Sequence, residues 1–252
     1  MFRHEAETRS FRLNQILAAY LAAIAGIVNS AGFVLIGSFT SHVTGNVGRF
    51  ADDLAMSRSA APLFALFLVI AFFAGAFIAS MAIESSVERR PRTYAILLFV
   101  EAGLLAAFAL LSYLMDTHDP RFRDVQGVLL CMAMGMQNSF VTRLSGAVVR
   151  TTHLTGVMTD LAIDAARWFR LWRARVGLVV GDAPTATPSR EKSLLLLTIL
   201  GSFIAGSVIG ALAAVKWDQL ALLLPTIALA VGGVYALAST IDRVALFKAS
   251  RQ

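Results

Sequence analysis

The sequence has little charge for its length. Asp, Glu, Lys and Arg make up 15% of its 252 residues, whereas a soluble domain contains about 25%. Apolar residues make up 57% of the chain, and in water such a composition would leave large apolar surfaces exposed. The scarcity of charge therefore argues against an ordinary soluble domain and favours an integral membrane protein.

Cysteine is nearly absent, and common enzyme signatures are missing. Cys131 is the single cysteine, so no disulfide can form within the chain. The sequence contains no His-Glu-x-x-His, no Gly-x-Ser-x-Gly and no phosphate-binding Gly-x4-Gly-Lys motif. We therefore expect no enzyme activity, no cofactor and no metal site. An intramembrane hydrolase or metal enzyme built on histidines and aspartates is the alternative.

Six apolar runs reach, or nearly reach, the roughly 20 residues that a helix needs to cross a bilayer. Polar segments separate them, and none alternates as the strands of a β-barrel would. The runs are approximately Ile16–Gly37, Ala61–Ile83, Tyr94–Leu114, Val125–Leu144, Ser193–Val215 and Leu220–Ile241. We predict an all-α membrane protein, with one transmembrane domain over residues 1–252 and the first run retained as a span in the lipid bilayer.

The basic residues are unevenly distributed between the loops. With the N-terminus in the cytoplasm, most Lys and Arg residues fall in cytoplasmic segments, such as those around Arg9, Arg90, Arg170 and Lys248. This bias orients multi-pass proteins, so we predict that both termini are cytoplasmic. Because the net charge of +6 comes from these membrane-flanking clusters, we expect no nucleic-acid partner. An oligomer is compatible with the pattern.

Two further stretches, Thr40–Met56 and Thr151–Trp172, are mixed in polarity and follow glycine-marked breaks. We predict that each forms a short helix that re-enters the membrane or packs at its face. Arg and Trp side chains gather in Arg167–Arg175, and together they suit the headgroup region, where anionic lipid attracts the charge. The segment is therefore a candidate contact with anionic lipid, or simply a membrane anchor.

The chain also resembles itself. Gly26–Ser30 and Gly135–Ser139 both read Gly-x-x-Asn-Ser, and Thr40–Gly45 and Thr151–Gly156 share the pattern His-x-Thr-Gly. The second pair aligns after a two-residue insertion in the later copy. Small residues four positions apart follow in the next span of each copy, but helix packing alone explains them. The paired motifs indicate an internal duplication.

The duplication predicts an inverted repeat. Repeat 1 covers about residues 13–115 and repeat 2 about residues 124–242. Each contains three spans, an odd number, so the second copy would enter the membrane from the opposite side. We predict about six transmembrane helices as a 3+3 inverted repeat, each copy with an interrupted or re-entrant helix after its first span. Secondary transporters use such repeats to build a substrate site near mid-membrane.

Duplicated polar residues are the candidates for solute binding. A buried amide without a partner costs a few kcal/mol, so the asparagines must find partners, either a solute or a neighbouring helix. An interhelical hydrogen bond, worth about 0.6 kcal/mol in membranes, is the structural alternative. The candidates are Asn29, Ser30, His42, Thr44, Gln137, Asn138, Ser139, His153 and Thr155.

Four carboxyl groups are candidates for proton coupling, in which a histidine near its neutral titration range would take part. Asp53 and Asp164 each lie eleven residues after a motif histidine, and in a helix they would share its face. Asp160 joins the face of Asp164. Glu101 lies alone in an apolar span, where burial favours its neutral form. For the aspartates and histidines, helix capping is the alternative role.

Helices that start after Gly37 and Gly146 would present partly positive N-terminal ends. Two such ends directed at one another suit an anionic solute, and Arg150 precedes the second motif. We predict a transporter of a small solute, with an anionic solute and proton coupling both open. A passive channel and a non-transporting membrane scaffold are the alternatives.

The paired motifs Ser41–Asn46 and Arg150–Gly156, with Gln137–Ser139 leading into the second, resemble the YoaK-like family of bacterial multi-pass membrane proteins. The resemblance covers nearly the whole chain, from about residue 12 to residue 242. It implies a bacterial inner-membrane protein of unknown function, and it supplies neither a substrate nor site residues. The long basic segment Trp168–Lys192 departs from the family pattern.

Overall fold

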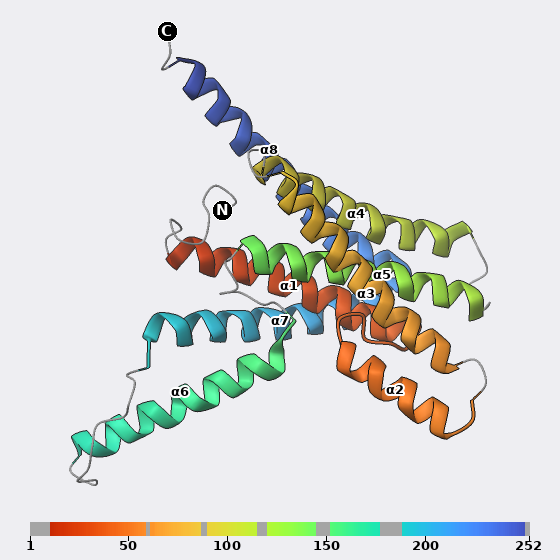
Figure 1. Ribbon diagram of the computed structural model, residues 1–252, viewed down its shortest axis with the longest axis horizontal. Coiled ribbons are helices and arrows are strands. Elements are labelled where there is room, and N and C mark those ends of the chain that lie inside the picture. The colour runs from red at the N-terminus through yellow and green to blue at the C-terminus, as the bar shows by residue number, and fades with distance from the viewer. Residues whose placement is uncertain are drawn as a thin grey trace.

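The computed structural model describes residues 11–58, 61–86, 90–114, 120–144, 152–176 and 188–249. Gly146, Arg150 and Thr151 lie outside these residues. All regular structure in the described part is helical, which confirms the predicted all-α class. The helices are α1 (Phe11–Ile36), α2 (Val43–Ala55), α3 (Ala61–Glu84), α4 (Arg90–Leu114), α5 (Pro120–Leu144), α6 (Leu154–Arg175), α7 (Arg190–Trp217), the 3-10 helix η3 (Asp218–Leu222) and α8 (Leu223–Ala249) (Figure 1).

Four apolar helical stretches in the described residues are long enough to cross a membrane: Phe11–Ile36, Leu63–Glu84, Arg92–Leu114 and Arg190–Ala238. The last of these contains α7, η3 and α8. Their outer faces are covered with exposed apolar side chains, including Phe67, Phe73, Ile204, Leu212 and Val231. Water would penalise this surface by about 25 cal/mol per Å², so these helices contact the lipid bilayer.

Helix α5 is less apolar than the other long helices. Its sequence includes Arg123, Asp124 and Gln126 near the start and Gln137 and Asn138 near the end. The helix nevertheless lies in the core, where the polar Gln126 and Gln137 are buried. Gln126 and Gln137 therefore face other helices, whereas Arg123 and Asp124 near the start of α5 are exposed.

Three helix pairs form the centre of the protein: α1 with α7, α3 with α5, and α4 with α8. In the first pair, Gly206 lies against the backbone of Ala23 and Gly210 against that of Ile27. These contacts advance in the same direction along both helices, so α1 and α7 run parallel. Glycine allows this approach because any side chain would collide with the facing backbone.

The pair of α3 and α5 is built in the same way. Gly75 of α3 lies against the backbone of Met132, and Gly135 of α5 lies against the backbone of Phe72. Gly26, which begins the first Gly-x-x-Asn-Ser motif, contacts α7 as Gly135 contacts α3. Both copies of the motif therefore place their glycine at a close helix–helix contact.

The two further predicted helices are present as α2 and α6. Helix α2 is short, with 13 residues, whereas α6 has 22 residues and is longer than the short helix predicted. Gly37 adopts a left-handed backbone conformation (φ 72°) at the end of α1, which glycine adopts without steric cost, and the chain then turns into α2. Helix α2 packs against α3, and α6 packs against α7. From neighbouring starting points near the centre of the view, α2 and α6 run toward opposite ends of the molecule (Figure 1).

Candidate functional site

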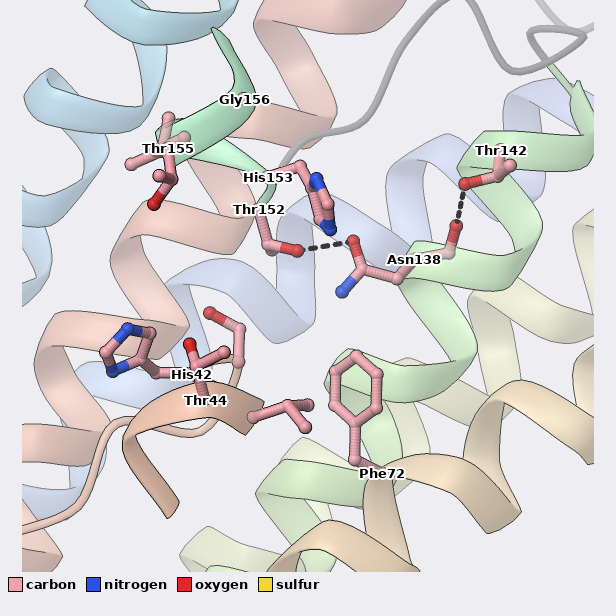
Figure 2. Close-up of a pocket in the computed structure, with 12 residues that line it drawn as sticks. His42, Thr44, Phe72, Asn138, Thr142, Thr152, His153, Thr155 and Gly156 are labelled. Carbon is pink, nitrogen blue, oxygen red and sulfur yellow. Dashed lines mark hydrogen bonds between the residues drawn. The ribbon is translucent and has the colours of Figure 1, made fainter. Parts of the chain in front are cut away.

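The two histidine motifs meet at one pocket, although they are far apart in the sequence (Figure 2). The pocket has a volume of about 600 Å³, within the roughly 300–1,000 Å³ typical of small-molecule sites. No carboxylate is among its lining residues in the described part of the chain. The lining consists of Ser41, His42, Val43, Thr44, Phe72, Asn138, Thr142, Thr152, His153, Leu154, Thr155 and Gly156.

Both motif histidines are helix N-caps, His42 for α2 and His153 for α6. Neither side chain makes a capping hydrogen bond, so the histidines occupy the capping positions without the side-chain bond that the capping alternative implies. The first backbone N–H groups of a helix have no acceptor within it, and they carry its partial positive charge. Since the first turns of α2 and α6 both line the pocket, it has the character of a hydrogen-bond donor site.

A matching hydrogen bond holds the residue before each histidine. The backbone N and the Oγ of Ser41 donate to Oδ1 of Asn29, at 3.3 and 2.9 Å. The Oγ1 of Thr152 donates to Oδ1 of Asn138 at 2.6 Å (Figure 2). The two asparagines therefore position the start of α2 and the start of α6 in the same way. Asn138 also lines the pocket, whereas Asn29 does not.

Asp53 is buried near the end of α2 and Asp164 is buried in the middle of α6, and both lie outside the pocket lining. Asp53 pairs with Arg58 at 3.0 Å, and Asp164 pairs with Arg167 at 3.3 Å and accepts a hydrogen bond from Ser193 at 3.0 Å. Eleven residues of helix advance about 16 Å along its axis. A shared helix face therefore does not bring each aspartate to its histidine.

The other two carboxyl candidates also lie outside the pocket lining. Asp160 forms an ion pair with Lys192 of α7 at 3.1 Å, and both side chains are about half exposed. Glu101 of α4 is only 2% exposed, and its Oε1 has no hydrogen-bond partner in the described structure. It lies close enough to Tyr20 of α1 to affect it electrostatically, and the Tyr20 hydroxyl donates to the carbonyl of Ala228.

Ser30, Gln137 and Ser139 do not reach the pocket lining either. Gln137 is fully buried, and its Nε2 donates to the carbonyl oxygen of Leu21 in α1 at 3.4 Å. Ser139 shares a hydrogen bond with Ser80 of α3 at 2.7 Å between their hydroxyl oxygens. Gln137 and Ser139 therefore bind helices to one another.

Sequence reasoning missed several lining residues. Ser41 and Thr152 directly precede the histidines, and Thr142 lies one helical turn after Asn138, so their positions in the motifs carried a signal. Phe72 lies in an apolar helix with several other phenylalanines, and no sequence pattern distinguishes it. Among the residues that the structure describes, no three His, Cys, Asp or Glu side chains are grouped as metal ligands.

The profile of the family described as "Protein of unknown function (DUF1275)" matches residues 17–237. The chain belongs to this family. It is 28% identical to the UPF0700 transmembrane protein YoaK of Bacillus subtilis (strain 168) over 153 residues, 59% of this chain and 65% of that protein. It is also 28% identical to the UPF0700 transmembrane protein RA0705 of Rhizobium meliloti (strain 1021) over 212 residues, 84% of this chain and 81% of that protein. No solved structure matches.

The predicted resemblance to the YoaK-like family is thus confirmed. The matched part of this DUF1275 protein includes both histidine motifs and both asparagines that position them. The alignment with YoaK covers less than two thirds of that relative. Both relatives are named as transmembrane proteins, in agreement with the apolar helices described above.

Proposed function

We propose that this DUF1275 protein transports a small anionic solute, which binds in the pocket between the starts of α2 and α6. The observation that carries the proposal is the meeting of both histidine motifs at one pocket that has no carboxylate among its described lining residues. The imidazoles, the hydroxyls of Thr44 and Thr155 and the backbone N–H groups of the first helical turns can donate hydrogen bonds, and each such bond to a charged group is worth about 1.5–3 kcal/mol. Several convergent donors therefore favour an anion.

The proposed transporter is an inverted repeat with α1–α4 as one copy and α5–α8 as the other. Its six spans are α1, α3, α4, α5, α7 and α8. The glycine contacts of α1 with α7 and of α3 with α5 support this arrangement, as do the matching bonds of the two asparagines. The opposite courses of α2 and α6 support it as well (Figure 1). Paired helix ends at such a repeat interface bind anionic groups in secondary transporters.

The charge distribution supports a bacterial inner-membrane location with both termini in the cytoplasm. In this orientation α6 runs from the pocket toward the cytoplasmic face. Its last turns carry Arg170, Arg173 and Arg175, and Phe169 and Trp172 are exposed on the same helix. This end of α6 contacts anionic lipid headgroups in the proposed arrangement, because the rings enter the interface while the guanidinium groups meet phosphate.

The same pocket supports transport coupled to protons. Histidine is the side chain that changes charge between about pH 5 and 8, and a protonated imidazole attracts an anion that a neutral one binds weakly. We therefore propose that protons accompany the anion, and we expect a proton gradient across the proteoliposome membrane to change the rate of anion uptake.

Ligand screening and flux measurements test the proposal. Purified protein is screened by thermal shift with chloride, nitrate, formate, acetate, lactate, sulfate and phosphate, and every anion that raises the midpoint is assayed for uptake into proteoliposomes. We expect saturable uptake, and we expect the double variant His42→Ala with His153→Ala to lose it. Thr226→Val is the control, because the Thr226 hydroxyl donates to the carbonyl oxygen of Leu222 one turn earlier, in η3, and lies outside the pocket lining.

Two results would overturn the proposal. The first is that none of these anions stabilises the protein or crosses the membrane with it. The second is that uptake continues unchanged in the double histidine variant. Uptake that never saturates, accompanied by single-channel currents in planar bilayers, would show a passive channel in place of a transporter.

A further inference from the structure

The pocket draws unequally on the two halves of the protein. Both motifs contribute the same positions, Ser41–Thr44 from one and Thr152–Thr155 from the other. The long helices contribute from one side only, through Phe72 of α3 and Asn138 and Thr142 of α5. The lining is therefore symmetric at the helix starts and asymmetric around them.

The missing counterparts follow from the sequence alignment of the two halves. Asn29 corresponds to Asn138 in the Gly-x-x-Asn-Ser motif, and Phe33 follows Asn29 as Thr142 follows Asn138. Phe203 and Phe72 each lie three residues before the glycine at a close helix contact. Asn29 and Phe203 are each only 8% exposed, whereas Phe33 is 45% exposed. The α1–α7 side is therefore closed at Asn29 and Phe203, where the α3–α5 side is open.

An aromatic row borders the closed side. The ring of Phe33 stacks on that of Phe39 with centroids 4.3 Å apart, and Phe39 meets His42 edge-on at 6.2 Å. On the open side, the position of Phe33 is taken by Thr142, which lines the pocket. The two sides therefore differ in the side chains next to the starts of α2 and α6, whereas the hydrogen bonds at these starts match.

The internal structure of the two helix pairs does not explain this difference. Gly26 contacts α7 as Gly135 contacts α3, and Asn29 holds Ser41 as Asn138 holds Thr152. Each pair therefore has the contacts needed to move as a unit, and the two pairs differ in their position relative to α2 and α6. A second state would exchange the positions of the two pairs. When such a second state is populated, its free energy lies within a few kcal/mol of the first.

We propose that Asn29, Phe33 and Phe203 are further solute-binding residues. They line the pocket in a second state, in which the α1–α7 pair stands open and the α3–α5 pair is closed. The same solute then meets Asn29 and Phe203 in place of Asn138 and Phe72, from the opposite side of the membrane. This inference rests on the proposed function for the identity of the solute, but not for the movement itself.

Side-specific cysteine labelling tests the movement. The native Cys131 is buried and is replaced by alanine to give a background without cysteine. Phe72→Cys and Phe203→Cys form the first matched pair, and Asn138→Cys and Asn29→Cys form a second pair in case a phenylalanine variant fails to fold. Phe108→Cys is the control, because Phe108 of α4 is fully buried and has no place in the pocket.

Membrane-impermeant maleimide is applied to membrane vesicles of each orientation. We expect Phe72→Cys and Asn138→Cys to react from one side of the membrane, and Phe203→Cys and Asn29→Cys to react from the other side. Each should react at least about tenfold faster than the control. Because the reaction is irreversible, labelled protein accumulates even from a state with a small population. The inference is overturned when the Phe203 and Asn29 variants stay as unreactive as the control from both sides. Reaction from the same side as their counterparts also overturns it.

The flux assay separates this inference from the proposed function. Saturable anion uptake with Phe203→Cys and Asn29→Cys unreactive leaves the transporter standing and removes the second state proposed here. Labelling from opposite sides without uptake of any of the named anions supports the two states and contradicts the proposal that the solute is an anion. When an anion is transported, its presence should slow the labelling of both Phe72→Cys and Phe203→Cys if both residues contact it. Slower labelling of Phe72→Cys alone contradicts a binding role for Phe203.

Discussion

Helices α2 and α6 begin alike and differ beyond their first turns. Each begins with a histidine N-cap, and an asparagine of the preceding long helix holds the residue before that histidine. Eleven residues after each histidine, Asp53 near the end of α2 pairs with Arg58 just beyond that helix, whereas Asp164 in the middle of α6 accepts a hydrogen bond from Ser193 of α7. The beginnings face a common pocket and share its chemistry, while the aspartates contact separate surroundings. The comparison therefore assigns function to the helix starts and local stability to the aspartates.

The largest effect is expected where the two halves are most alike, at the glycine contacts. Gly26→Leu and Gly135→Leu should each destabilise the protein by about 3 kcal/mol or more, because the side chain collides with a facing backbone. Gly201→Leu is the control, since a Cβ there meets nothing within 4 Å. Thermal midpoints and yields in detergent measure the effect. A large loss for one glycine and none for the other would break the equivalence of the two helix pairs.

The histidines should come next, through solute binding. His42→Ala and His153→Ala should each weaken anion affinity by about 1.5–3 kcal/mol, the value of a hydrogen bond to a charged group. Calorimetric titration with an anion found in the screen measures both variants against wild type. Similar losses support a solute shared by both helix starts, and a loss confined to one histidine would place the anion at a single motif.

Removing the asparagines should cost less. Asn29→Ala and Asn138→Ala each delete the acceptor for a hydroxyl, at about 0.6–1.5 kcal/mol of folding free energy. Because Asn138 lines the pocket and Asn29 does not, Asn138→Ala should also weaken solute binding in the present state. Thermal midpoints with and without anion separate the two contributions. Equal weakening by both variants would show that the asymmetry of the pocket has no effect on affinity.

The aspartates should give the smallest effect. Asp53→Asn and Asp164→Asn weaken ion pairs whose arginine partners are 62% and 39% exposed, so we expect losses below about 1 kcal/mol. Asp52→Asn is the matched control on an exposed position of α2. Uptake should continue in all three variants. Loss of uptake at a normal thermal midpoint would instead give the aspartates the proton-coupling role that their spacing suggested.

Much of the fold was predictable because long apolar runs in a membrane leave the helix as the simplest structure. Phe11–Ile36 and Arg90–Leu114 begin a few residues earlier than predicted, since charged and polar residues extend a helix beyond the apolar core that hydropathy detects. Helices α2 and α6 were also predicted, from glycine breaks and mixed polarity. Their relation to the membrane stays a prediction.

The helix starts were the most predictable part of the site. The duplicated pattern identified His42, Thr44, His153 and Thr155, which line the pocket, and it also identified Asn138 of α5. Within the long helices, residues adjacent in sequence point about 100° apart, so Asn138 faces the pocket while Gln137 faces α1. Which face of a span meets the pocket depends on packing, and a single sequence does not record it.

The packing of α1 against α7, and of α3 against α5, has a consequence for how the protein is made. Each tight pair takes one helix from the first half of the chain and one from the second. During synthesis α3 is therefore made before its partner α5, and α1 before its partner α7, so both helices lack these contacts until the second half of the chain has been made. Separately expressed halves should be degraded individually but accumulate when produced together, because only the mixture can assemble both pairs.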